Sequence, residues 1–457
     1  MENDRLLKLV EAYQKHFKQY NRPDYNETEV RNDFVNPFFE ILGWDVQNKK
    51  NLPQHLREVK HEASVFVEEN GKQVKKKPDY EFHVGSTPYF FLETKKPNVD
   101  IMASKEAAFQ TRRYGWNGNL EISVLSNFTD LVIYDTSVRP NENDKPSVAQ
   151  VAHFHFTEYV DKFDEISRLL SYETVVSGAF EKTFENISSS LKKEPFDKYF
   201  LSQIKEWRLV LSKDIVNSTI NQETLNIFVQ KLINRIVFLR ICEDRELEKY
   251  ESLKNIGTYA ELKKVFTAAD KKYDSGLFEL IDGEQFEISD SILVDIFKEL
   301  YYPNSCYEFS IVDPFIIGQI YELFLEEEIV IKDGIVVAER KPEIVDSQGV
   351  VNTPKNIADI IVKTTLTPLF SDEKFTEWDS YRIADICCGS GNFLLSAYEF
   401  IINRYIEYYM KNCLDMAIQK GLLISDVGNN FKLSYEKKRE ILQNNIWGVD
   451  IDILAVE

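Results

Sequence analysis

Cysteine and histidine are scarce in this sequence. Its 457 residues include five cysteines and six histidines. The cysteines are odd in number and none has CxxC spacing, which argues against a disulfide framework and against a structural zinc site. The histidines do not cluster as metal ligands, and the HFHF run at residues 153–156 has the alternation of a strand.

Long apolar runs are also absent. No run of about 18 uncharged apolar residues offers a membrane span. The first residues, MENDRLLKLVEAYQKHF, form a charged amphipathic pattern without the apolar centre of a signal peptide. We therefore expect no membrane segment and a cytoplasmic location. The hydrophobic share of 43% is ample for packed cores, and the length suggests about three domains of roughly 150 residues each.

Positive charge is in deficit overall but gathers locally. The net charge of −20 and the isoelectric point near 5.0 argue against a nonspecific nucleic-acid binder. Basic runs nevertheless surround one β-rich stretch, at residues 75–78, 95–96 and 112–113. Such residues can hold phosphate while the acidic remainder keeps the protein soluble. A solvated charged surface explains any single run about as well.

Hydrophobic periodicity divides the chain into three blocks. Residues 1–157 mix a helical start with short β-rich runs such as YEFHVG, YFFLETK, ISVLSN and LVIYDT. Residues 158–328 have almost entirely helical spacing. Residues 329–457 return to alternating strands and helices. The fold class is therefore an α/β multidomain protein with an all-helical middle domain.

The first block contains a charged pattern in an apolar setting, PDYEFHVGSTPYFFLETKKP. Asp79 precedes one strand, Glu93 lies fourteen residues later on the next, and Lys95 shares a strand face with Glu93. A magnesium-dependent nuclease needs two nearby carboxylates to hold the ion and a cation to orient water. Charged triplets are common as surface salt bridges, so the pattern is weak without its aromatic neighbours.

These residues resemble the PD-(D/E)xK nuclease core at the N-terminus of type I and type IIG restriction enzymes. The resemblance implies cleavage of double-stranded DNA with Mg²⁺. ETEVRNDFVNPFFEILGWDV resembles the helix before that core, in which Glu29 would complete the metal site of Asp79 and Glu93. AAFQTRRYGW resembles the following helix, with Gln110 and Tyr114 in a Gln-x-x-x-Tyr pattern. Glu29 as a surface charge and Tyr114 as a core aromatic are the alternatives.

The third block contains a glycine-rich turn after a strand, ADICCGSGNF. Gly389 and Gly391 allow a tight turn beside a ligand, and Asp450 ends a second strand, where an acid can grip ribose hydroxyls. The turn resembles the D-x-x-x-G-S-G-x-F motif of adenine-specific DNA methyltransferases, and GVVNTPKNIADIIV resembles their upstream motif. The resemblance implies S-adenosylmethionine as cofactor, bound by Thr353, Pro354, Asp385, Gly389, Gly391, Asn392, Phe393 and Asp450.

Two departures from the methyltransferase pattern are visible. Ile386, Cys387 and Cys388 replace the common Pro-Ala-Cys, and Asn352 replaces an aromatic residue before Thr353. The first change should not abolish cofactor binding, whereas the second puts one packing contact in doubt. Small thiols beside such a loop are more often packing than nucleophiles, so we assign the cysteines no chemistry.

The helical block resembles the connector of type IIG enzymes. IVFLRICEDRELEKY has the apolar run followed by Glu-Asp-Arg, and FSIVDPFIIGQIYELFLEE resembles a segment just before the methyltransferase. Ordinary core packing explains each segment alone. The order of the three blocks favours the connector interpretation.

The sequence contains no Asn/Asp-Pro-Pro-aromatic segment to hold a flipped adenine. We expect the first part of a restriction-modification protein that joins a site-specific endonuclease to an adenine-N6 methyltransferase, with domains at 1–157, 158–328 and 329–457. Target recognition would lie in a missing C-terminal region or in a separate chain. Two alternatives stay open: a scaffold that senses S-adenosylmethionine, and a subunit that needs a partner chain.

Overall fold

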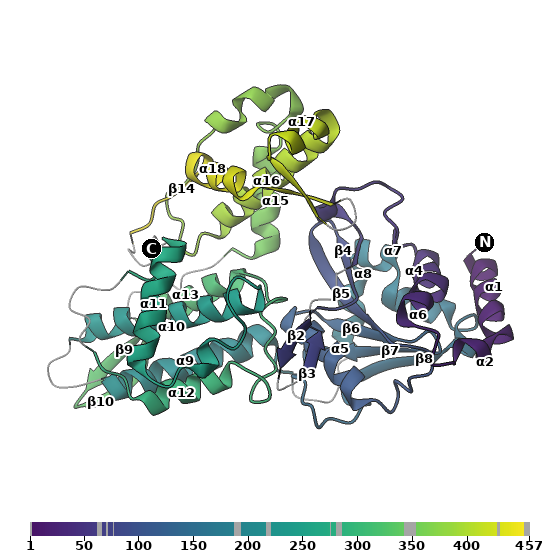
Figure 1. Ribbon diagram of the computed structural model, residues 1–457, viewed down its shortest axis with the longest axis horizontal. Helices are drawn as coiled ribbons and strands as arrows, with labels where there is room; N and C mark the ends of the chain where they lie inside the picture. The colour runs from purple at the N-terminus through teal and green to yellow at the C-terminus, as the bar shows by residue number, and fades with distance from the viewer. Residues whose placement is uncertain are drawn as a thin grey trace. The chain divides into compact units, whose positions relative to one another are not determined.

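The computed structural model describes residues 2–61, 66–69, 72–75, 77–186, 193–215, 221–274, 276–279, 286–341, 353–426 and 430–451. Two compact units make up the chain. The first contains residues 1–199, 244–250 and 300–312, and the second contains 200–243, 251–299 and 313–457. Figure 1 labels their helices and strands. No helix among the described residues is long and apolar enough to cross a membrane.

A mixed six-stranded sheet is the centre of the first unit (Figure 1). Its order is β1-β4-β5-β6-β7-β8, and only β5 and β6 pair in parallel. The strands predicted from alternation are confirmed. Their bounds are β1 (Val59–His61), β4 (Tyr80–Val84), β5 (Thr87–Thr94), β6 (Ile122–Ser126), β7 (Asp130–Asp135) and β8 (Gln150–His155), and a separate hairpin joins β2 (Phe66–Glu69) to β3 (Lys72–Lys75).

The two faces of this sheet bury different side chains, because alternate residues of a strand point to opposite faces. On β6 and β7, Val124 and Ile133 join the large core under the N-terminal helices, while Leu125 and Val132 pack with Ala108 of α5 (Lys105–Asn117). Helix α5 is the crossover between the parallel strands β5 and β6.

The large core is covered by helices that precede and follow the strands of the six-stranded sheet in the sequence. These are α1 (Glu2–Lys15), α2 (Phe17–Tyr20), α3 (Glu27–Val30), α4 (Asn36–Ile41), α6 (Phe163–Leu170), α7 (Tyr172–Val176) and α8 (Ala179–Asn186), with short 3-10 turns η2 (Gln54–Leu56) and η3 (Phe156–Glu158). Helices α3 and α4 are joined by one π-helical turn, η1 (Arg31–Val35). Such a turn changes the direction of side chains that follow it, and π turns are frequent at functional sites.

The second unit begins with the helices that the periodicity predicted. They are α9 (Phe196–Ile215), whose first four residues belong to the first unit, α10 (Gln222–Asp244), η4 (Leu253–Asn255), α11 (Tyr259–Tyr273), α12 (Asp290–Glu299) and α13 (Phe315–Glu326). A hairpin of β9 (Glu327–Lys332) and β10 (Ile335–Arg340) follows.

The C-terminal part returns to α/β structure, as predicted. Strands β11 (Ile383–Asp385) and β14 (Ile446–Gly448) pair in parallel. Between them lie α16 (Asn392–Asn412), α17 (Leu414–Gln419), the hairpin β12 (Leu423–Asp426) and β13 (Asn430–Leu433), and α18 (Tyr435–Asn445); α15 (Lys355–Leu366) and η5 (Asp372–Ser380) precede them. Trp378, fully buried, packs with Tyr405 and Ile401 in the core of this part.

Candidate functional site

Asp79 lies immediately before β4 and is almost completely buried. Its Oδ2 accepts hydrogen bonds from the backbone nitrogen of Thr94, at 2.7 Å, and from Thr94 Oγ1, at 2.6 Å. Its Oδ1 forms an ion pair with the guanidinium of Arg31, which also donates from Nε to Thr94 Oγ1 at 2.7 Å. These bonds tie the start of β4 to the end of β5 and to the π-helical turn.

Glu93 and Lys95 contact each other, as their shared strand face predicted. Glu93 is 2% exposed, and Lys95 donates from Nζ to Glu93 Oε1 at 2.7 Å. Burial acts to lower the pKa of Lys95, but the Glu93 carboxylate, with smaller contributions from Glu27 and Asp79, outweighs burial and leaves the pKa raised. Lys95 is therefore a cation held among carboxylates.

Gln110 and Tyr114 extend this contact along α5. Lys95 Nζ lies 3.3 Å from Gln110 Oε1, and Gln110 Nε2 donates to the Tyr114 hydroxyl at 3.0 Å. The two side chains are one helical turn apart, so they lie on the same face. Burial raises the pKa of Tyr114 well above its usual value. The phenol therefore stays protonated and can orient its neighbours but cannot act as a base.

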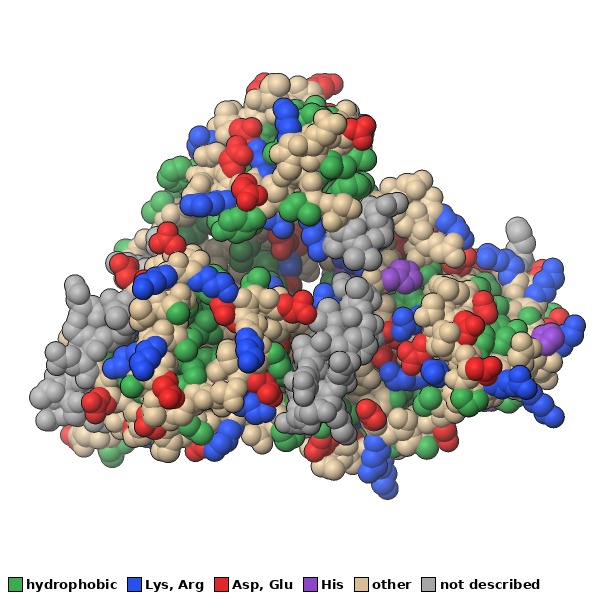
Figure 2. Space-filling model, in the orientation of Figure 1, with side chains coloured by type: hydrophobic (Ala, Val, Ile, Leu, Met, Phe, Trp, Pro, Cys, Tyr) green, Lys and Arg blue, Asp and Glu red, His purple; other side chains and the backbone are tan. Residues whose placement is uncertain are grey.

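The predicted basic surface at Arg112 and Arg113 is wrong, because both side chains are buried. Arg112 pairs with Asp144 at 2.6 Å. Arg113 donates to the carbonyl oxygens of Cys306 at 3.1 Å and Tyr307 at 2.8 Å. These arginines anchor α5 within the first unit. On the face seen in Figure 2, Lys and Arg side chains are interspersed with Asp and Glu. The side chains of residues 75 and 76 lie outside the described residues.

Glu29 has a local role in the structure. Its Oε2 accepts from the backbone nitrogen of Asn26 at 2.7 Å, while Asn26 Oδ1 accepts from the nitrogen of Glu29 at 3.1 Å, which is a capping box at the start of α3. Glu27 instead lies 3.8 Å from Arg31, and its charge acts on Lys95. Glu27 and Arg31 are not among the residues predicted from the sequence, although their four-residue spacing on a helix was an available signal.

The donors near Lys95 suit a hard cation. Asp79 and Glu93 are both buried, come from neighbouring strands and offer only carboxylate oxygens, which Mg²⁺ prefers. Within the described ranges, no three His, Cys, Asp or Glu side chains come close enough to hold a metal ion. Binding would therefore rest on these two carboxylates and water, and a metal role for Glu29 stays a prediction.

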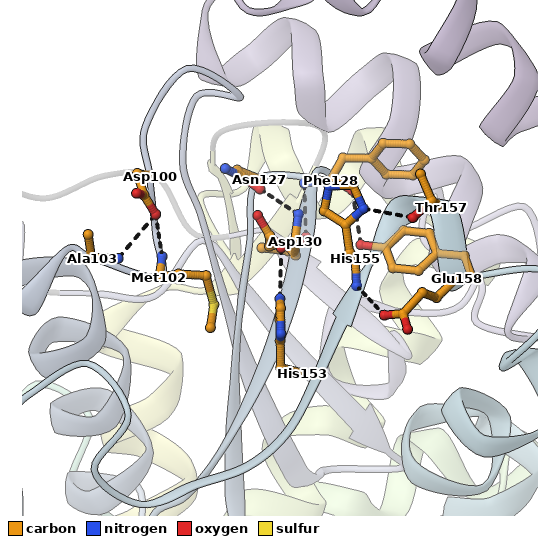
Figure 3. A network of polar contacts seen from close by, with 12 residues as sticks. Asp100, Met102, Ala103, Asn127, Phe128, Asp130, His153, His155, Thr157 and Glu158 are labelled. Atoms are coloured by element: carbon orange, nitrogen blue, oxygen red, sulfur yellow. Dashed lines mark hydrogen bonds and ion pairs between the residues drawn. The ribbon is translucent and has the colours of Figure 1, made fainter.

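The loop that carries Lys95 onward from β5 is held by the turn between β6 and β7. Asn127 Nδ2 donates to the carbonyl of Val99 at 2.8 Å, and Asp100 Oδ1 accepts two backbone N–H bonds of its own loop. At the same end of the sheet, Asp130 Oδ1 and His153 Nε2 lie 2.7 Å apart. Figure 3 shows the contacts of Asp100 with Met102 and Ala103 and the contact of Asp130 with His153. The loop after the predicted nuclease residues is thereby fixed on two sides.

The glycine-rich turn follows β11 in the second unit. Gly389 and Gly391 have φ of +50° and +79°, which L side chains rarely adopt. Among the described residues, a Cβ added at either position would meet no atom within 4 Å. Asp385 Oδ1 accepts from the nitrogen of Cys387 at 3.1 Å, and Asp450 Oδ2 accepts from the nitrogen of Gly389 at 2.8 Å.

The space beside this turn is a pocket of about 210 Å³. Five predicted cofactor residues line it: Thr353, Asp385, Gly389, Asn392 and Phe393. Three others are adjacent to the lining but do not form it. Pro354 is the N-cap of α15, and Gly391 is the N-cap of α16. Asp450, two residues after the end of β14, accepts a hydrogen bond from the turn. Asn352 lies outside the described residues. An open pocket beside a glycine-containing turn and a helix start fits an adenosyl cofactor.

Helix α13 forms the opposite wall, through Tyr321, Glu322 and Leu325. Ser390 Oγ lies 3.3 Å from Glu322 Oε1. A Cβ added at Gly318 would lie 3.0 Å from Ser390 Cβ, so the helix and the turn approach as closely as glycine allows. These pocket residues of α13 are not among those predicted from the sequence, because the apolar periodicity of the segment is explained by core packing in a connector.

Comparison with known proteins agrees with the motifs. Residues 24–142 match the family model described as the type I restriction enzyme R protein N terminus (HSDR_N). That range contains all the predicted nuclease residues. Among solved structures, a chain of the cryoEM structure of a DrdV–DNA complex matches with a TM-score of 0.27 and 12% identity, over 86% of this chain and 35% of that chain. This likeness is too weak to assign a fold.

Two curated relatives carry the clearer signal. RM.Eco57I of Escherichia coli, a type II restriction enzyme and methyltransferase, is 40% identical over 466 residues, which are 99% of this chain and 45% of that protein. RM.MjaORFECS2P of Methanocaldococcus jannaschii is 24% identical over 304 residues, 50% of this chain and 24% of that protein. The chain thus spans less than half the length of either relative. The predicted resemblance is confirmed: along almost its whole length, this chain is homologous to part of a type II restriction enzyme and methyltransferase.

Proposed function

We propose that the first unit is a PD-(D/E)xK endonuclease that cleaves double-stranded DNA with Mg²⁺. The observation that carries this proposal is the contact of Lys95 with the buried Glu93, next to the buried Asp79. The homology to a restriction enzyme supports it. Asp79 and Glu93 would hold the metal, with Glu27 or Glu29 as the nearby acid that adds charge.

The residues of the chain suit hydrolysis of a phosphodiester. When bound, Mg²⁺ supplies charge to the phosphate and favours ionisation of the attacking water. The Lys95 ammonium is held by Glu93 and Gln110, so it can orient a water molecule and offset the charge that develops on phosphate. Tyr114 fixes Gln110 in turn.

We further infer that the third block is the start of a Rossmann-like domain that binds S-adenosylmethionine for methylation of adenine N6. Thr353, Asp385, Gly389, Asn392 and Phe393 line the same pocket. Pro354, Gly391 and Asp450 would support the cofactor from the rim of the pocket, and the methyltransferase half of the relative's name supports the assignment. Recognition of a DNA sequence and methylation would need the rest of such a protein, as in type IIG enzymes.

Cleavage of plasmid DNA tests the nuclease assignment. With Mg²⁺ present, Lys95→Ala should reduce the rate by about 100-fold or more, because a positioned cation contributes on this scale. Lys96→Ala is the matched control, since its ammonium lies 3.5 Å from the carbonyl of Pro23, away from Glu93. Equal rates for Lys95→Ala and the parent would refute the role of Lys95.

A further inference from the structure

We propose that Glu322 of α13 makes the pocket select S-adenosylmethionine over its demethylated product, S-adenosylhomocysteine. The two ligands share adenosine, carboxylate and ammonium groups and differ at sulfur. The first carries a sulfonium cation there. When the methyl group leaves, the electron pair of the broken S–C bond stays on sulfur, and the product has a neutral thioether. This inference rests on the proposed cofactor function of the pocket.

The first ground is the position of Glu322. It lines the pocket from a helix that packs directly on the glycine-rich turn, with Ser390 Oγ at 3.3 Å from its carboxylate. Gly318, one turn earlier on α13, leaves no room for a Cβ against Ser390. The close packing therefore holds the carboxylate at the pocket wall, where its charge acts on any ligand inside.

The second ground is the sign of the charge around the pocket. Its described lining residues include the carboxylates of Glu322 and Asp385 and contain no lysine, arginine or histidine. The nearby Lys355 of α15 is engaged by Asp313, 2.8 Å away. Burial, followed by the charges of Asp450 and Asp385, raises the pKa of the Cys388 thiol in the same turn. Negative potential therefore prevails at this wall.

Electrostatics sets the size of the effect. An opposite charge about 6 Å away in a half-buried site, at an effective dielectric constant of about 40, changes affinity about tenfold. Glu322 is half-buried, so its field is only partly screened. S-adenosylhomocysteine lacks the sulfonium charge and therefore lacks this attraction to Glu322. Its replacement by S-adenosylmethionine after methyl transfer is thereby favoured.

Calorimetric titration of the chain with three ligands tests the proposal. The ligands are S-adenosylmethionine, S-adenosylhomocysteine and sinefungin, which carries an amine in place of the sulfonium methyl group. We expect Glu322→Gln to weaken the two cationic ligands by about tenfold and to leave the neutral one unchanged. Glu322→Asp should restore most of the preference. Glu326→Gln, on the same helix but outside the pocket lining, should behave as the parent.

Each other outcome counts against a specific statement. If Glu322→Gln weakens all three ligands equally, Glu322 acts on a group that the ligands share, such as the ammonium, or by holding Ser390 and the turn, and the charge selection is refuted. If the variant binds all three as the parent does, Glu322 has no role toward the ligand. If the parent binds none of the three ligands, the proposed cofactor function itself fails.

Discussion

The two candidate sites differ in how carboxylates are compensated. In the first unit, Asp79 and Glu93 are almost fully buried, and each contacts a cation, Arg31 or Lys95. In the second unit, Glu322 and Asp385 line an open pocket whose described lining contains no basic residue. A site built from opposite charges is already balanced, and the proposed Mg²⁺ would have to displace or join its cations. A pocket whose described lining carries carboxylates favours a cationic ligand.

The largest expected effect comes from removing the cation that pairs with Asp79 in the first site. Arg31→Ala would leave Asp79 buried without its ion pair and should destabilise the first unit by about 3 kcal/mol. Urea unfolding near neutral pH measures this, with the exposed Arg22→Ala as control. If Asp79 binds Mg²⁺, adding the metal should recover part of the loss, because it replaces the missing positive charge. A variant as stable as the parent would mean that the Arg31 contact is energetically neutral.

The second prediction adds a methyl group to the glycine-built site. Gly318→Ala should reduce affinity for S-adenosylmethionine several-fold, because its Cβ would lie 3.0 Å from Ser390 Cβ and 3.3 Å from Asn392 Oδ1. Plasmid cleavage should not change. Gly257→Ala is the control, since among the described residues its Cβ would meet only Glu261 Oε2, at 3.7 Å. Unaltered ligand affinity in Gly318→Ala would show that α13 can move away from Ser390 without weakening ligand binding.

The third prediction concerns alkaline pH and the first site. The folded protein binds the Lys95 proton more tightly than the unfolded chain, because Glu93 raises its pKa against the effect of burial. The contribution of the Lys95 proton to the free energy of unfolding is fully present below the pKa of lysine in the unfolded chain, about 10.4. It is lost as the pH rises through the higher pKa of Lys95 in the folded protein. Unfolding measured from about pH 9.5 to 11.5 should therefore show a steeper loss for the parent than for Lys95→Met. Lys96→Met should keep the parent's slope; identical slopes in all three would contradict the coupling.

The smallest effect tests the like charge of the second site. Burial and the carboxylates of Asp450 and Asp385 raise the pKa of Cys388, so iodoacetamide should label it more slowly than an unfolded thiol at about pH 8.5. Asp385→Asn should speed labelling by a few-fold, as followed by peptide mass spectrometry. Cys413, remote from these carboxylates in the sequence, serves as the internal reference. Labelling of Cys388 that is insensitive to Asp385 would leave burial and Asp450 as the causes of the raised pKa.

Short-range spacing allowed part of both sites to be predicted. Glu93 and Lys95 share a face because strands alternate, and Gln110 and Tyr114 meet because a helix returns after four residues. Local spacing does not predict whether Glu27 or Glu29 lies nearer to Lys95. That depends on the π-helical turn and on the position in which Thr94 and Asp79 hold Arg31.

What the sequence by itself determined is the order of the blocks, their strand and helix periods, and the local groups Glu93–Lys95, Gln110–Tyr114 and the glycine-rich turn. Only the tertiary structure decided that Arg113 is buried against the carbonyls of Cys306 and Tyr307, and that Glu322 faces the pocket at Ser390. The reason is physical. Local periodicity fixes which side of an element a residue occupies, but the partner on that side is chosen by packing between segments far apart in the chain.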